Sequence, residues 1–121
     1  MFNESFKETF KKRIYESVIR LIRTLDTFPK DSTTKILVDQ LVRSYTSILA
    51  NYIEAQAASS RKDFTNYIHH SLKSANESKV WISILKDTNR LLGKDAVYFL
   101  GELKEISNIL ASSLLKLKNL K

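Results

Sequence analysis

The sequence predicts an all-α protein, and three observations support this. Apolar residues recur at spacings of three and four along four separate stretches, which is the period of a helix with one buried face. The 121 residues include only 2 Gly and 1 Pro, so turns are scarce and connections short. No stretch alternates apolar and polar residues as a half-buried strand does. We therefore expect an up-down-up-down antiparallel four-helix bundle forming a single domain over residues 1–121.

The first two predicted helices are separated by a proline. The first ends at Thr27-Phe28-Pro29, because the residue before a proline avoids the helical region. Asp31 or Ser32 can cap the second, which weakens around residues 57–60. The first buried stripe comprises Phe6, Phe10, Ile14, Val18, Leu21 and Leu25, and the second Leu37, Leu41, Ile48, Tyr52 and Ala55.

The last two predicted helices have their own boundary signals. Ser60 followed by Asp63 resembles a capping box and starts the third helix. Gly93 is the expected stop of that helix, and Asp95 the expected cap of the fourth. The third stripe comprises Phe64, Ile68, Leu72, Ala75, Ile82, Leu85 and Leu92, and the fourth Val97, Leu100, Leu103, Ile106, Leu110, Leu114 and Leu117.

Composition narrows the setting of the protein. There is no Cys, hence no disulfide or thiolate metal site, and no apolar run approaches the roughly 18 residues of a membrane span. The N-terminus lacks the apolar segment of a secretory signal. We therefore expect a cytoplasmic protein with no membrane association.

The net charge of +7 points to polyanionic partners, nucleic acid first. The excess is spread over three of the four helices, which favours a broad field over a short targeting motif; a merely basic, solubilising surface is the alternative. We predict contacts to nucleic-acid phosphates, with RNA favoured, and the candidate residues are Lys12, Arg13, Arg20, Arg23, Arg61, Lys62 and Lys73.

No catalytic constellation is present, so we expect no enzyme, no metal and no cofactor. His69 and His70 are adjacent and point about 100° apart on a helix, so they cannot chelate one ion. The Ser-rich segments have neither a histidine base in register nor a glycine elbow. Two other hypotheses remain: a protein–protein adaptor that docks an acidic partner or a polymerase, and a structural ring without a ligand.

A polar column beside the apolar face of the second helix needs an explanation. A mixed polar and aromatic stripe accompanies it on the third helix. Such stripes suit either a protein–protein interface or a polar network between the two helices, and we expect Glu54 or Glu77 to pair with Arg43 or with Asn51. The column comprises Gln40, Arg43, Ser47, Asn51 and Glu54, and the stripe Tyr67, His70, Ser74, Glu77, Trp81 and Ile84.

Several segments together resemble a known family. They are Phe28-Pro29-Lys30, Gln40-Leu41-Val42-Arg43-Ser44, Ser47-Ile48, Ala50-Asn51-Tyr52-Ile53-Glu54, Ser60-Arg61-Lys62-Asp63-Phe64 and Ser74-Ala75-Asn76-Glu77. In this order they resemble the four-helix bundle proteins encoded in intervening sequences of bacterial 23S rRNA genes and, more distantly, the accessory proteins of diversity-generating retroelements. The resemblance implies a homopentameric ring; the retroelement members bind nucleic acid and a reverse transcriptase.

The chain departs from the family pattern at two positions in the second helix. Ala55 follows Glu54 where the family has glycine, and Leu49 stands where the family often has proline. Both changes favour helix continuity. We therefore expect an uninterrupted second helix.

Overall fold

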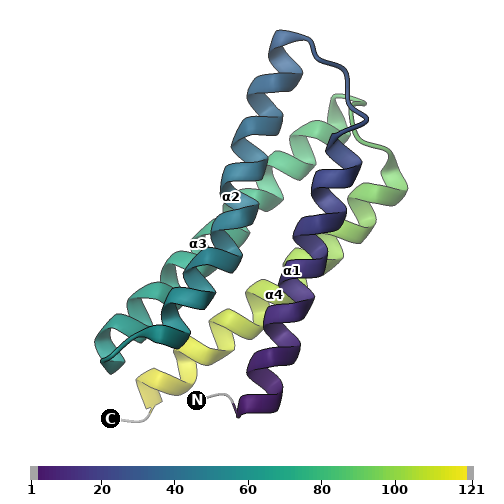
Figure 1. The fold of residues 1–121 in the computed structure, drawn as a ribbon. Coiled ribbons are helices and arrows are strands. Elements are labelled where there is room, and N and C mark those ends of the chain that lie inside the picture. Colours follow the sequence, from purple (N-terminus) through teal and green to yellow (C-terminus); the bar gives the residue numbers. More distant parts are fainter. Residues whose placement is uncertain (1–2, 120–121) are drawn as a thin grey trace.

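The computed structural model describes residues 3–119 and contains four helices. They are α1 (Glu4–Leu25), α2 (Ser32–Ala57), α3 (Arg61–Asp87) and α4 (Gly93–Asn119). Figure 1 shows that they run alternately up and down, so that the start of α1 and the end of α4 lie at the same end of the bundle as the α2–α3 turn. Helix α3 packs against α2 and α4, and α1 packs against the same two helices, so α1 and α3 lie diagonally. The predicted all-α bundle is confirmed.

Each of the first three helices begins with a side-chain cap. Asn3 accepts a hydrogen bond from the Phe6 amide at 2.7 Å, which satisfies one of the free N–H groups at the start of α1. Asp31, not Ser32, caps α2, and Ser60 caps α3 as predicted. Helix α2 is uninterrupted, in agreement with the expectation from its sequence.

The predicted α3–α4 boundary is wrong. Gly93 does not end α3 and Asp95 does not cap α4, because α3 already ends at Asp87 and α4 begins at Gly93 itself. The left-handed residue that closes α3 is Asn89, with φ of 60°. The amide that follows it donates to the Leu85 carbonyl oxygen at 2.8 Å, as in a Schellman motif. Asn reaches this conformation less easily than Gly, so its signal in the sequence is weaker.

The predicted core is confirmed at most positions and wrong at three. Phe6 is 38% exposed, Leu92 64% and Val97 74%. Leu92 lies in the α3–α4 connection rather than on α3, and Val97 is only one turn into α4 because that helix starts early. The largest fully buried side chains include Ile14, Leu21, Leu41, Tyr45, Ile48, Tyr52, Ile68, Ile82, Leu85, Phe99, Leu103 and Ile106.

Small hydroxyl side chains lie within the contact of α2 and α3. The hydroxyls of Ser44 and Ser78 are 2.8 Å apart, and the Ser71 hydroxyl donates to the Ile48 carbonyl oxygen at 2.8 Å. Such partners offset the cost of burying a hydroxyl. In the part of the chain that the structure describes, no helix is both long enough and apolar enough to cross a membrane.

Candidate nucleic-acid interface

The candidate residues on α1 differ in how their charges are compensated. Arg13 forms a bidentate pair with Glu102 of α4, with both N–O distances 2.9 Å, and this hydrogen bonding raises the pKa of Arg13. The Arg20 guanidinium lies over the Tyr98 ring, 3.7 Å from its centroid. Lys12, Arg20 and Arg23 are exposed. Three of the four α1 candidates therefore present charge to solvent, whereas the charge of Arg13 is compensated within the chain.

The α3 candidates lie on a different part of the surface. Arg61, Lys62 and Lys73 are all exposed, but α3 makes no packing contact with α1. The structure therefore does not bring the seven sequence-predicted residues onto one continuous face; it separates them into an α1 group and an α3 group.

The fold adds cations to the α3 group that the sequence analysis did not include. Lys116 and Lys118, in the last turn of α4, lie with Arg61 and Lys62 at the end of the bundle where α2 turns into α3. We call these four residues, together with Lys7 of α1, the basic end. The signal was present in the sequence, because an up-down bundle places the last turn of the fourth helix beside the first turn of the third.

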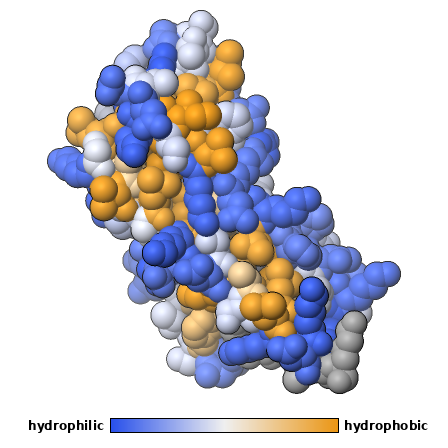
Figure 2. Space-filling model, turned by 180° about the vertical axis from the view of Figure 1, so that it is seen from behind, coloured by the Kyte–Doolittle hydropathy of each residue, from blue (hydrophilic) through white to orange (hydrophobic). Residues whose placement is uncertain are grey.

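Two hollows that share Arg61 lie at the basic end. The first, of about 740 Å³, is bordered by α1, α2, α3 and α4, and the second, of about 480 Å³, lies between α3 and α4. Arg61 and Leu117 line both, and the Arg61 guanidinium donates to the Leu117 carbonyl oxygen at 2.6 Å. Figure 2 shows the α3–α4 side, where apolar areas are bordered by hydrophilic side chains towards the lower end.

Charge distinguishes these hollows from those along α1. Among the described residues, no carboxylate lines either hollow at the basic end. The two hollows along α1 that contain Tyr15 include Glu16 in one and Glu8 in the other. Within residues 3–119, none of Arg61, Lys62, Lys116 and Lys118 forms an ion pair. The basic end thus concentrates uncompensated positive charge.

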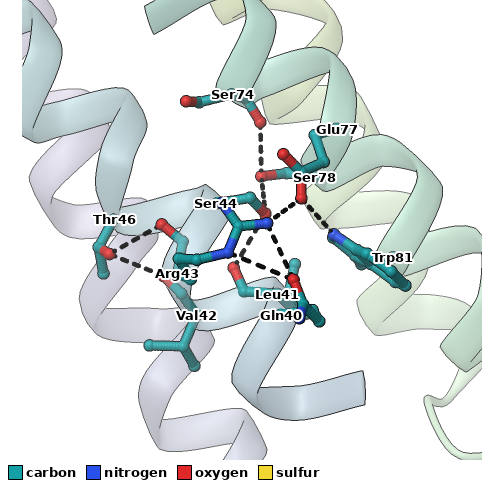
Figure 3. A network of polar contacts seen from close by, with 10 residues as sticks. All are labelled: Gln40, Leu41, Val42, Arg43, Ser44, Thr46, Ser74, Glu77, Ser78 and Trp81. Atoms are coloured by element: carbon teal, nitrogen blue, oxygen red, sulfur yellow. Dashed lines mark hydrogen bonds and ion pairs between the residues drawn. The ribbon is translucent and has the colours of Figure 1, made fainter. Parts of the chain in front are cut away.

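Part of the polar column forms a network between α2 and α3, shown in Figure 3. Arg43 donates to Gln40 at 2.9 Å and to Glu77 of α3, and the Trp81 indole donates to the same Glu77 oxygen at 2.9 Å. The hydrogen bonds that Trp81 and Arg43 donate to Glu77 lower its pKa, and the one from Trp81 has the larger effect. The predicted pairing of Glu77 with Arg43 is confirmed.

The other column residues stay outside this network. The Asn51 amide donates to the Ser47 carbonyl oxygen at 2.9 Å, within α2. Glu54 is exposed. The Arg43 side chain is itself 55% exposed, so the network lies at the surface, where another molecule could reach it. An interface role for these residues stays a prediction.

The described residues contain no group of three or more His, Cys, Asp or Glu side chains able to hold a metal ion. His69 and His70 are both exposed on α3. His69 lines the second hollow of the basic end, beside Lys62 and Lys118.

Comparison with known proteins finds a matching family and similar solved structures. Residues 8–112 match the family model of the 23S rRNA-intervening sequence protein. The fold is also similar to the crystal structure at 1.70 Å resolution of a protein of unknown function, from the S23 ribosomal protein family, of Bacteroides thetaiotaomicron VPI-5482. That similarity covers 89% of this chain and 96% of the other, with 29% sequence identity and a TM-score of 0.82. No curated protein matches the chain.

Proposed function

The chain belongs to the family of 23S rRNA-intervening sequence proteins, and from this premise we propose that it is a non-enzymatic, oligomeric scaffold that binds nucleic acid, RNA in preference, through phosphate contacts. The observation that supports the proposal is the basic end, where Arg61, Lys62, Lys116 and Lys118 have no carboxylate partner within residues 3–119 and the described residues that line the hollows include no acidic one. Lys and Arg in such a setting retain their full charge for phosphate oxygens.

The binding is electrostatic and tolerant of sequence. Phosphate contacts release counterions, so affinity falls steeply as salt rises. Assembly into the homopentamer that the family resemblance implies would multiply the net charge of +7 fivefold, to +35. Five basic ends would also add avidity to individually weak contacts.

The test compares two variants that each lose three charges. One replaces Lys12, Arg20 and Arg23 of α1 by Gln, and the other replaces Lys62, Lys116 and Lys118 of the basic end. Fluorescence anisotropy on nuclease-treated protein, titrated across salt, gives the affinity for a structured RNA. We expect the basic-end variant to lose about 10- to 100-fold in affinity, and its log–log salt slope to fall by about two to three.

The α1 variant is the matched control, and we expect a smaller loss from it because carboxylates line the hollows along α1. Equal losses of affinity from both variants would show that RNA binds over the whole surface and not mainly at the basic end. Unmodified protein that does not bind RNA even at low salt would contradict the proposal.

A protein–protein adaptor is the second candidate, and exposed apolar side chains favour it. Val80, Leu92 and Val97 are all more than half exposed, and Val80 lies one turn along α3 from Glu77 of the Arg43–Glu77 network. Exposed apolar side chains that gather into a contiguous patch are typical of surfaces that contact other proteins. If these surfaces also hold the oligomer together, Trp81→Ala and Asn51→Leu should change its mass in light scattering without changing helicity. If the oligomer mass is unchanged in both variants, these residues do not take part in contacts between chains.

A further inference from the structure

We propose that the first hollow of the basic end is a binding pocket for the terminal phosphomonoester of a nucleic-acid strand, together with the nucleotide that carries it. The inference rests on the proposed function, because it names the part of the nucleic acid that this surface recognises best. It is carried by three features of the hollow: its size, its cations and a buried amide without a hydrogen-bond acceptor.

The size suits one nucleotide rather than a duplex. The hollow measures about 740 Å³, within the roughly 300–1,000 Å³ of small-molecule sites. Its lining combines apolar side chains, including Phe64 and Leu117, with cations. A nucleotide presents the same two chemistries, since every base has an apolar face that packs against aromatic rings and its phosphate is anionic.

The charge favours a dianion. Lys7, Arg61 and Lys116 come from α1, α3 and α4 and line the one hollow. Only Lys7 has a carboxylate partner among residues 3–119, Glu4 at 3.3 Å. The Leu117 carbonyl holds the Arg61 guanidinium but leaves its charge uncompensated. A terminal phosphate carries close to two negative charges at neutral pH, whereas each internal phosphodiester carries one. Two uncompensated cations therefore match the terminal group better.

The buried amide is an independent observation. Gln56 lines this hollow, and its Nε2 atom is buried and has no acceptor within the described chain. Leaving a buried donor unpaired is unfavourable, so such an atom calls for a partner that the chain does not supply. Bases and phosphates are rich in acceptors. A bound nucleotide would give Gln56 the hydrogen bond it lacks.

The experiment compares short RNA strands that differ only at one end. One pair carries a 5′-phosphate or a 5′-hydroxyl with the fluorophore at the 3′ end, and a second pair carries a 3′-phosphate or a 3′-hydroxyl with the fluorophore at the 5′ end. At one fixed salt concentration we expect the phosphorylated member of at least one pair to bind about tenfold more tightly. The pair that shows the difference identifies which terminus enters the hollow.

Two variants locate the effect. Arg61→Gln should abolish the preference for the phosphorylated strand, and Lys73→Gln is its matched control, since it removes the same charge from an exposed position of α3 that lines neither hollow. Gln56→Met keeps the size of the side chain but removes the amide, and it should weaken binding of the phosphorylated strand more than binding of the hydroxyl-ended strand. A preference that survives Arg61→Gln would overturn the assignment to this hollow.

The outcome separates the pocket from the proposed function. Hydroxyl-ended and phosphorylated strands that bind equally well would overturn the pocket while leaving general RNA binding intact. If no strand binds, the proposed function fails, and the pocket is then tested alone by titrating a nucleoside monophosphate and following the Phe64 and Gln56 signals by NMR. Absence of saturable shifts there would overturn the pocket as well.

Discussion

The two ends of the bundle differ in whether their charged side chains have partners within the chain. At the end formed by the two other connections, which we call the capped end, Arg90 donates to the Thr34 hydroxyl at 2.8 Å and lies 3.9 Å from Asp31. Thr34 in turn donates to Asp31 at 2.7 Å, and Asp31 caps α2. At the basic end, by contrast, Lys62, Lys116 and Lys118 have no ion pair among residues 3–119, and the Gln56 amide has no acceptor.

The difference separates the charges that stabilise the fold from those that remain available to bind a ligand. A cation such as Arg90, which ties the α3–α4 connection to the start of α2, contributes to stability, and its removal leaves its partners unsatisfied. A cation on the rim of a hollow contributes little to stability, because exposed charges interact weakly in water. Stability and ligand binding should therefore respond to mutation at opposite ends of the molecule.

The largest effect on stability should come from Arg90→Met at the capped end. The substitution keeps the aliphatic stem but removes the hydrogen bond to the buried Thr34 hydroxyl and the charge near Asp31. We expect the free energy of unfolding to fall by about 2 kcal/mol, the range for hydrogen bonds that involve a charged group. Urea unfolding followed by circular dichroism measures it. A loss below about 0.5 kcal/mol would show that the Arg90 contacts contribute little to stability.

Asn89 is the next most sensitive position at the capped end. Its φ of 60° suits Gly and Asn but costs other residues free energy. Asn89→Ala should lower the free energy of unfolding by about 1 kcal/mol, whereas Asn89→Gly should change it by only a few tenths. The two variants are matched in removing the same side-chain amide. Equal losses from both would show that the amide, not the backbone conformation, is what matters.

At the basic end, Gln56→Met should have the opposite sign. It removes a buried donor without an acceptor and replaces it with an apolar chain of similar length. We expect the free energy of unfolding of the ligand-free protein to rise by about 0.5–1 kcal/mol. A destabilised variant would show that the amide is already satisfied within the fold, which would weaken the case for the pocket.

Neutralising the exposed lysines of the basic end should barely affect stability. For the variant with Lys62, Lys116 and Lys118 replaced by Gln, we expect a change within about 0.5 kcal/mol. Thermal and urea unfolding on the samples used for RNA binding provide the measurement. A clear loss of stability would mean that these lysines support the fold and that any loss of RNA binding has a structural cause.

The smallest effect should be the contribution of Asp31, at the capped end, to the loss of stability at acid pH. Hydrogen bonds from Thr34 lower the pKa of Asp31 below its usual 3.8. The ionised carboxylate therefore stabilises the fold above that value, and the contribution is lost as the pH falls through 3.8 towards the folded-state pKa. We expect unfolding curves of Asp31→Asn to lose part of the acid-induced decline that the unmodified protein shows. If stability falls with pH in the same way for Asp31→Asn and for the unmodified protein, the Asp31 carboxylate does not contribute to the acid-induced decline.

Much of the fold follows from the sequence because it depends on local rules. The stripes of apolar residues predicted all four helices, and the caps at Asp31 and Ser60 follow from residues three or four positions apart. The α3–α4 boundary was misplaced because Gly93 is a stronger local signal than Asn89, although the chain uses Asn89. The exposure of Leu92 and Val97 follows from that same error.

Which distant side chains meet depends on the packing of the four helices. The sequence alone determined the helices, their antiparallel order, the net charge of +7 and the pool of candidate cations. It could not show that Glu102 compensates Arg13, that Lys116 and Lys118 join Arg61, or that the Nε2 atom of Gln56 is buried without an acceptor among the described residues. The physical reason is range: helix formation is set by neighbours within one turn, whereas charge compensation and burial depend on residues that only packing brings together.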